Sequence, residues 1–319
     1  MNKNISKKKL VCFGGGTGMP SLLSGLKKNP WLEITAVVNM FDTGGSSGEL
    51  KDQFGILPPG DVLKSLLALS ENESFARRLL QKRIQNPKST IHTGGNILLL
   101  GLEKVFNDYI SAIDGLGQLL NIHGRVLPVT TEASTLQATF TNSATHNGET
   151  SIDIGVYEGF TVEELKLNPQ VPAYPEVLNA IEQADCICIG PGSFYTSVLP
   201  NFLPSGVKEG LSASNCKVIF ICNLLTEGWG MKDFAVQHIT QTVEEYIDRN
   251  VDCVIANSTD QPRDILDKYS NERKAPIQIT CDENFASKLI LADLWTNPNI
   301  ARHDEDRLGY LVSSIILNI

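Results

Sequence analysis

Short apolar runs alternate along the chain with stretches in which leucine and valine recur every three or four positions. Near-continuous apolar runs predict strands of a parallel sheet that helices bury on both faces. Such runs occupy residues 10–13, 33–40, 184–189, 217–222 and 251–256. The three-to-four spacing predicts helices over residues 20–28, 61–69 and 96–106 and after residue 302. This alternation predicts an α/β fold of the doubly wound type with a mostly parallel sheet.

The segment near residues 125–160 departs from this pattern. It is rich in threonine, serine and valine, and apolar and polar residues alternate over residues 134–140 and 151–157. Alternation predicts half-buried strands, and the dipeptide of Asn147 and Gly148 is typical of hairpin turns. We therefore expect residues 1–319 to form a single α/β domain with a β-rich insertion at this place.

The composition is that of an ordinary globular protein, with 42% hydrophobic and 20% charged residues. No apolar run approaches the roughly 20 residues that cross a bilayer, so we expect no membrane insertion. The N-terminus lacks the apolar core of a secretion signal, which favours a cytoplasmic location. The formal net charge of −9 disfavours nucleic acid as a partner, because that requires a basic face, but it leaves room for one nucleotide.

Glycine-rich turns follow the first two predicted strands. Such turns let backbone N–H groups approach an anion, and a helix that follows adds its positive N-terminal end. Two of them on successive strands predict a site for a phosphorylated ligand, for which a nucleotide is the best candidate; a tight turn without a ligand is the alternative. The residues expected to contact the ligand here are Gly14, Gly15, Gly16, Thr17, Gly18, Gly44, Gly45, Ser46 and Ser47.

Polar residues and glycines also lie where later predicted strands end. Ligands of open α/β sheets bind outside the carboxyl ends of the strands, so we expect these positions on the same rim. The candidates there are Gly190, Gly192, Ser193, Asn223 and Asn257. Asn96 and Arg302, near the starts of two helices, are further candidates, although Thr93 as a helix cap and a solvated arginine explain these positions almost as well.

Two aspartates are candidate metal ligands. Asp42 follows the second strand, where dinucleotide-binding folds hold a carboxylate against the ribose. A Mg²⁺ ligand is an equally good role, since Mg²⁺ favours one or two carboxylates plus ligand phosphates. Asp42 could instead cap its own turn, and Asp61 could be the N-cap of a helix. Mg²⁺ is therefore a candidate cofactor, with Asp42 and Asp61 as its ligands.

No sequence pattern identifies a reaction. The dinucleotide fingerprint Gly-x-Gly-x-x-Gly fails, because Met19 or Ser21 stands where its last glycine belongs, and no P-loop is present. His-Glu-x-x-His and paired cysteines are also absent. We expect no organic redox cofactor, and the residues alone indicate a nucleotide site without showing whether a bond is made or broken.

Several motifs together resemble the YvcK/CofD-like family. They are GGGTG at residues 14–18, GGSSG at 44–48, PPGD at 58–61, GN at 95–96, GPGS at 190–193 and RHD at 302–304. They follow the family's order over nearly the whole chain. The resemblance implies a Rossmann-like fold that binds a nucleotide at the carboxyl ends of its strands.

The family has two branches with different activities. One, labelled gluconeogenesis factor, binds UDP-sugars such as UDP-N-acetylglucosamine and affects central carbon metabolism, cell shape and envelope synthesis. The other is 2-phospho-L-lactate transferase, which uses a nucleotide-activated phospholactate and Mg²⁺. The GGSSG and PPGD motifs are closer to the first branch, although Thr43 stands where an aspartate is usual and Glu49 where an arginine is usual. We therefore expect a nucleotide-sugar-binding regulatory protein, with the CofD-like transferase as the alternative.

The resemblance also implies roles for the candidate residues. The turns at residues 14–18 and 190–193 would cradle the diphosphate, while Asn223, Asn257 and Arg302 would contact the nucleoside. The two aspartates would face the metal or the sugar. The resemblance allows a homodimer, whose surface no sequence pattern locates.

Overall fold

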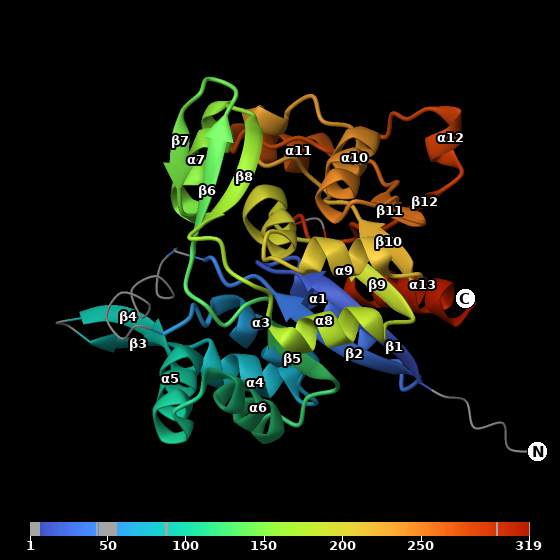
Figure 1. Ribbon diagram of the computed structural model, residues 1–319. Helices are drawn as coiled ribbons and strands as arrows, with labels where there is room; N and C mark the ends of the chain where they lie inside the picture. The colour runs from blue at the N-terminus through green and yellow to red at the C-terminus, as the bar shows by residue number, and fades with distance from the viewer. Residues whose placement is uncertain (1–6, 43, 45–55, 87–88, 298, 319) are drawn as a thin grey trace, which may run out of the picture.

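A seven-stranded sheet forms the centre of the computed structural model, which describes residues 7–42, 44, 56–86, 89–297 and 299–318 (Figure 1). Its strands, in spatial order, are β12 (Leu289–Ala292), β11 (Cys253–Asn257), β10 (Lys217–Ile221), β9 (Cys186–Ile189), β1 (Lys8–Gly14), β2 (Leu32–Val38) and β5 (Arg125–Pro128). Every neighbouring pair is parallel. The arrangement confirms the predicted doubly wound α/β fold.

The strand order reverses at the centre of this sheet. From β1 the chain moves outward through β2 to β5, and from β9 it moves the other way through β10 and β11 to β12. β1 and β9 are neighbours, and Phe13, one residue before the end of β1, pairs with Ile189, the last residue of β9. Sheets of this kind bind ligands in the crevice at such a reversal, outside the carboxyl ends of the strands.

Helices cover both faces of the sheet, which is why its central strands are apolar. All of β9 is buried, as is β1 beyond its first two residues. One helical layer contains α1 (Met19–Leu26), α3 (Gly60–Leu69) and α13 (Glu305–Leu317). The other contains α8 (Pro175–Glu182), α9 (Val207–Ala213) and α10 (Val236–Ile247). The helices predicted over residues 20–28 and 61–69 are thereby confirmed as α1 and α3.

Smaller elements complete the fold. Between β2 and β5 come α4 (Glu73–Leu80), the hairpin of β3 (Arg83–Asn86) and β4 (Ser89–Thr93), α5 (Gly94–Phe106) and α6 (Tyr109–Leu119). Later elements are the short helices η1 (Phe194–Val198), η2 (Leu199–Phe202), η3 (Trp229–Met231), α11 (Arg263–Asn271) and α12 (Glu283–Ala286). Over the described ranges, no helix has both the length and the apolar character needed to cross a membrane.

A small antiparallel sheet and a helix lie between β5 and β9 in the chain. The strand order is β7 (Thr145–Asn147), β6 (Thr135–Phe140) and β8 (Val162–Asn168), and α7 (Glu149–Glu158) packs beside them. The strand predicted over residues 134–140 is confirmed as β6. The strand predicted over residues 151–157 is wrong, because these residues belong to α7. Ile152 and Val156, four residues apart, are buried while Ile154 is exposed, and this is helical rather than alternating burial.

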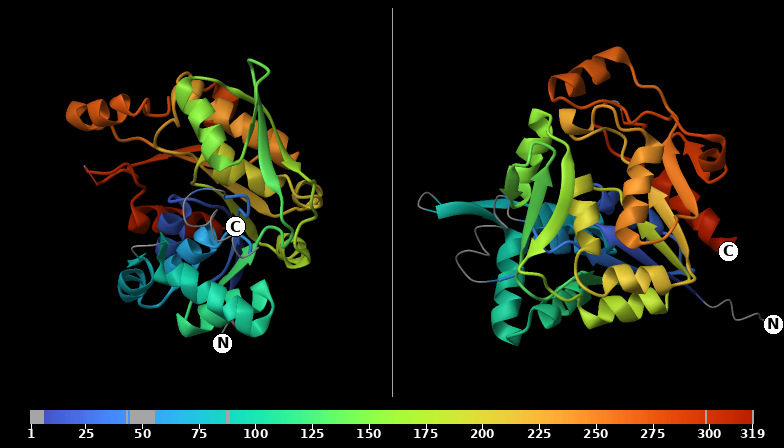
Figure 2. Two further views of the ribbon diagram at one scale, coloured as in Figure 1. Left: turned by 90° about the vertical axis from the view of Figure 1, so that its left-hand side faces the viewer. Right: turned by 45° about the horizontal axis from the view of Figure 1, so that its top comes forward.

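Two boundaries of this insertion also differ from the prediction. Residues 125–128 form β5 at the edge of the main sheet, so the insertion begins after them. The turn predicted at Asn147 and Gly148 lies between β7 and α7, where Gly148 has a φ of 79° that favours glycine. In Figures 1 and 2 the insertion and α11 lie on the same side of the main sheet.

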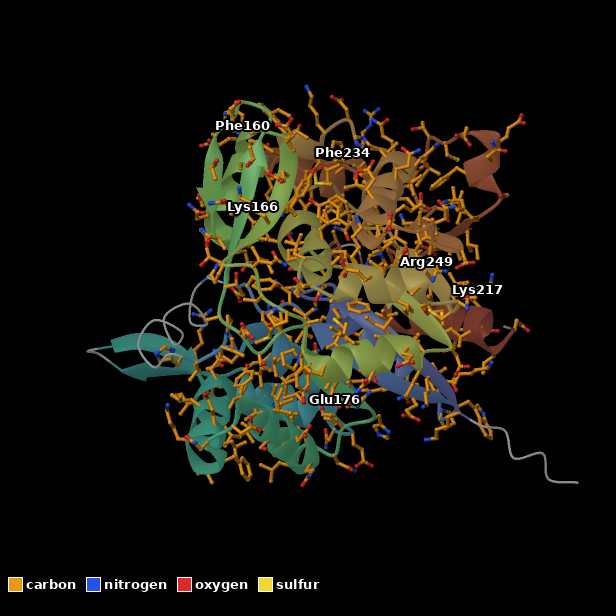
Figure 3. All side chains as sticks on the ribbon, in the orientation of Figure 1. Phe160, Lys166, Glu176, Lys217, Phe234 and Arg249 are labelled. Atoms are coloured by element: carbon orange, nitrogen blue, oxygen red, sulfur yellow. The ribbon has the colours of Figure 1, made fainter. Side chains whose placement is uncertain are left out.

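Ion pairs close the amino end of the sheet near β10 and β11. Lys217 Nζ lies 2.8 Å from Asp252 Oδ1, and Arg249 Nη2 lies 3.6 Å from Asp252 Oδ2; Figure 3 labels both cations. The pairing lowers the pKa of Asp252 although burial opposes this. The carboxyl end of the sheet is different, because it opens into a cleft.

Candidate functional site

A cleft of about 770 Å³ opens where the strand order reverses. The turns after β1, β2, β9 and β10 form one side, and α7 and the segments that follow α11 and precede α13 form the rest. The lining residues are Thr17, Gly18, Asp42, Gly44, Glu149, Thr150, Asp153, Ile154, Tyr157, Pro191, Gly192, Ser193, Asn223, Leu224, Leu225, Thr226, Glu227, Tyr269, Lys274, Ala301, Arg302 and His303. Its volume is typical of small-molecule sites.

The structure brings many of the predicted ligand contacts to this cleft. Those that line it are Thr17, Gly18, Asp42, Gly44, Gly192, Ser193, Asn223 and Arg302. Those in the same turns but outside the lining are Gly14, Gly15, Gly16 and Gly190. Asn257 lines a neighbouring pocket of about 360 Å³, and Asn96, buried at the start of α5, lines neither. The predicted contacts Gly45, Ser46 and Ser47 lie outside the described residues.

The glycine-rich turn at residues 14–18 packs directly against the turn at residues 190–193. A Cβ atom on Gly18 would lie 2.7 Å from the carbonyl carbon of Pro191, so only glycine lets the two backbones approach this closely. Gly16 has a φ of 63°, a conformation that side chains disfavour. The packing of the two turns therefore requires these glycines whether or not a ligand is bound.

Asp61 holds the first turn in place. Its Oδ2 accepts a hydrogen bond from the Gly16 N–H at 2.9 Å, and its Oδ1 lies 2.9 Å from Lys64 Nζ. Burial disfavours the charged form of Lys64, but attraction to Asp61 outweighs it and raises the pKa of Lys64. The alternative role of Asp61 as an N-cap is wrong, because α3 begins at Gly60 with Pro59 as its N-cap. Its role as a metal ligand stays a prediction.

Asn223 and Glu227 hold the glycine-rich turn at residues 190–193 in place. The Asn223 amide donates to the Gly192 carbonyl at 2.8 Å and accepts from the Gly192 N–H at 3.3 Å. Glu227 accepts hydrogen bonds from the Phe194 N–H at 2.8 Å and from Ser193 Oγ at 3.1 Å. Burial is the main cause that raises the pKa of Glu227 to about 7. Glu227 is not among the ligand contacts predicted from the sequence, although it lies in one of the polar turns that follow the strands.

Carboxylates from two elements meet at the cleft. Burial and the neighbouring Asp42 raise the pKa of Glu149, and burial raises the pKa of Asp153 although a hydrogen bond from Thr196 Oγ1 at 3.1 Å opposes it. Asp42 accepts a hydrogen bond from the Gly44 N–H at 2.6 Å and so caps its own turn. Sequence reasoning missed Glu149 and Asp153, because it assigned part of their segment to a strand.

These carboxylates have the oxygen ligands that Mg²⁺ prefers, so their chemistry fits the candidate cofactor. Within the described ranges, no three His, Cys, Asp or Glu side chains come together in a group that could hold a metal ion. Carboxyl groups with raised pKa values gain stability from a proton or a nearby cation. An anionic ligand entering this cleft would therefore need a cation, a proton or a basic side chain beside it.

Basic side chains lie on the wall of the cleft that the C-terminal part of the chain provides. Lys274 and the exposed Arg302 line the cleft, and attraction to Lys274 partly opposes the raised pKa values of Asp153 and Glu227. His303 is buried and its Nε2 donates to the Cys222 carbonyl at 3.1 Å. Burial lowers the pKa of His303 to about 4, so it is neutral at pH 7 and supplies no charge.

An arginine sandwiched between two aromatic rings fastens α7 at the rim of the cleft. The Arg273 guanidinium lies 4.6 Å from the ring centre of Tyr157 and 4.5 Å from that of Trp229. Arg273 Nη1 also donates to the Tyr157 carbonyl at 3.1 Å. These contacts join the insertion to the C-terminal half of the chain.

Asn257 is engaged with its own backbone surroundings. Its Nδ2 donates to the Thr259 carbonyl at 3.0 Å, and its Oδ1 accepts from the Leu294 N–H at 3.0 Å. These bonds fix the exits of β11 and β12. The amide therefore holds the backbone segments beside the smaller pocket.

The fold and the position of the cleft define a Rossmann-like, doubly wound α/β protein. The chain belongs to the CofD family, because the family model described as 2-phospho-L-lactate transferase CofD matches residues 10–294. The predicted membership of the YvcK/CofD-like family is thus confirmed.

Two curated relatives are similar over nearly their whole length. A putative gluconeogenesis factor from Thermotoga maritima is 35% identical over 314 residues, covering 96% of this chain and 99% of that protein. The gluconeogenesis factor of Bacillus subtilis is 34% identical over 316 residues, covering 97% and 98%. A crystal structure of a UPF0052 family member from Bacillus halodurans superposes with a TM-score of 0.88 at 34% identity, covering 98% of this chain and 99% of that one.

Proposed function

We propose that this protein is a cytoplasmic regulator of the gluconeogenesis-factor type that binds a nucleotide-sugar such as UDP-N-acetylglucosamine and affects carbon metabolism, cell shape and envelope synthesis. The names of the curated relatives support the type. The observation that supports the ligand is the cleft at the strand reversal, which residues of the glycine-rich turns line together with Lys274 and Arg302. The diphosphate would lie against the turns, between them and these cations.

The carboxylates in the cleft suggest that a diphosphate would bind together with a cation or a proton. Asp42, Glu149, Asp153 and Glu227 line it together with the two cations. A diphosphate adds negative charge to this set, so we propose that Mg²⁺ or proton uptake accompanies binding.

Thermal shift and titration calorimetry with UDP-N-acetylglucosamine, UDP-glucose, GDP and NAD, each with and without Mg²⁺, test this function. A ligand that binds only the folded state stabilises it by about 2.7 kcal/mol at a hundredfold excess over Kd. We expect the UDP-sugars to bind and Arg302→Ala or Lys274→Ala to weaken them about tenfold, as for loss of one charge-assisted hydrogen bond. Arg263→Ala, an exposed arginine on α11 outside the cleft lining, is the control. Unchanged affinity in both cleft variants would refute the assignment.

The second candidate is a CofD-like phospholactate transferase. The carboxylates that face the glycine-rich turns favour it, since Mg²⁺ there would stabilise charge on a transferring phosphate. Formation of a phospholactyl product on a deazaflavin acceptor, together with GDP binding that depends on Mg²⁺, would select this candidate. We also propose a homodimer, which light scattering of the purified chain tests.

A further inference from the structure

Helices α4 and α5 expose apolar side chains at a distance from the cleft. In Figure 1 they lie at the lower edge of the molecule, whereas the insertion and α11 lie at the top. Only Gly95, Asn96 and Leu99 of α5 are buried. The exposed fractions are 61% for Phe75, 58% for Leu79, 43% for Ile97, 37% for Leu98 and 77% for Val105. We refer to these five residues as the apolar face.

The two helices adjoin, so the apolar face spans both of them. A Cβ atom on Gly94, the first residue of α5, would lie 3.3 Å from the Leu79 carbonyl oxygen. Ile97 and Val105 lie two helical turns apart on one side of α5, and Phe75 lies one turn before Leu79 on α4. Single exposed apolar residues are ordinary, but adjoining ones mark a contact surface.

The segment from α4 to α5 carries more basic than acidic residues, although the chain as a whole is acidic. Arg78, Lys82, Arg83 and Lys104 are exposed, and none of them forms an ion pair within the described part of the chain. The acidic residues of this segment are Glu73, which is paired with Lys27 and Arg77, and Glu103; the exposed Glu71 and Asp108 lie just beyond its two ends. The exposed apolar side chains therefore lie in a basic region of the chain.

We propose that the apolar face docks this protein onto the surface of an anionic lipid bilayer. Phenylalanine, leucine, isoleucine and valine side chains would enter the headgroup boundary while the four cations neutralise anionic lipids, as in peripheral amphipathic helices. A second copy of the chain fits less well, because a two-fold contact through this face would bring the same cations together. The contact is peripheral and crosses no bilayer.

Co-sedimentation of the full chain with vesicles tests the proposal. We expect binding to vesicles of phosphatidylcholine mixed with phosphatidylglycerol and little binding to phosphatidylcholine alone. Each cation near the surface is worth about 1 kcal/mol, or about fivefold, so Arg78→Gln with Lys82→Gln lowers the partition constant about 25-fold. Phe75→Ser with Val105→Ser lowers it about tenfold through lost apolar burial.

Two matched variants serve as controls for these changes. Tyr310→Ser removes an aromatic side chain that is 78% exposed on α13, and Arg263→Gln removes an exposed cation on α11. Both should bind the mixed vesicles like the original chain. The proposal is overturned if the mixed vesicles do not bind the chain, or if the face variants bind them unchanged. It is also overturned if light scattering shows a dimer that Phe75→Ser dissociates.

Discussion

At the scale of single residues, the turns that line the cleft are held in place by hydrogen bonds from side chains to the backbone, without a ligand. The Asn223 amide donates to the Gly192 carbonyl and accepts from the Gly192 N–H, and the Asp61 carboxylate accepts from the Gly16 N–H. The glycine-rich turns are predictable from sequence because glycine is needed where two backbones meet. The hydrogen-bond partners of Asn223 and Asp61 are not predictable from sequence. Each partner lies about 30 or more residues away in the chain, and only the order of the strands in the sheet brings it close.

Glu227 should give the stability of the protein a distinct dependence on pH. Its pKa is about 7 in the folded chain and about 4.3 when unfolded, so the folded state holds a proton that the unfolded state releases between these values. The free energy of unfolding therefore falls as pH rises from about 4.3 to 7, by about 4 kcal/mol at most from this group. Glu227→Gln keeps an acceptor for the Phe194 N–H and should remove this loss. Urea unfolding at pH 5 and pH 8 measures it.

The comparison must be made between variants, because His303 acts in the opposite sense. Its pKa falls to about 4 on folding, so its contribution to stability is lost as pH falls from about 6.5 to 4. The difference between the original chain and Glu227→Gln cancels this term. Glu245→Gln, an exposed glutamate, is the control. Parallel pH profiles for the original chain and Glu227→Gln would contradict the account.

At the scale of elements, the sequence predicted the central strands and several helices, and it assigned α7, whose pattern is ambiguous, to a strand. Near-continuous apolar runs identified the central strands because burial on both faces leaves little choice of residue. In α7 the residues Ile152, Ile154 and Val156 alternate like a strand, yet only the first and last are buried. Because α7 was not predicted as a helix, its residues Glu149 and Asp153 were not predicted as site residues.

The crossing of α1 and α13 offers a test of packing between elements. The two helices touch at Gly25 and Gly309, and a Cβ atom on Gly25 would lie 2.9 Å from Gly309 Cα and would clash with the Glu305 carbonyl oxygen. Gly25→Ala should therefore lower the free energy of unfolding by about 3 kcal/mol, as for overpacked cores.

The matched substitution should have the opposite effect. Gly101 lies in the middle of α5 with nothing within 4 Å of its added Cβ atom. Gly101→Ala should raise the free energy of unfolding by about 0.5–1 kcal/mol through helix propensity. Denaturant unfolding of both variants decides, and equal effects would show that the helix crossing does not depend on close backbone contact.

At the scale of the whole molecule, the arginine sandwich links the insertion to the C-terminal half across the rim of the cleft. Arg273→Ala removes the contacts to Tyr157 and Trp229, which at exposed sites are worth about 0.5–1 kcal/mol each. We expect a fall of about 1–2 kcal/mol in the free energy of unfolding and faster amide exchange in α7. If amide exchange became equally faster in α8, which Arg273 does not contact, the result would indicate a general loss of stability instead.

The central claim is that the cleft at the strand reversal binds a nucleotide-sugar, and hydrogen–deuterium exchange tests it most directly. Exchange is measured with and without saturating UDP-N-acetylglucosamine in the presence of Mg²⁺. The account predicts slower exchange in residues 190–198, in residues 223–231 and in α7, with no change in the distant α12. Unchanged exchange in all three cleft segments, or protection confined to other parts of the chain, would contradict it.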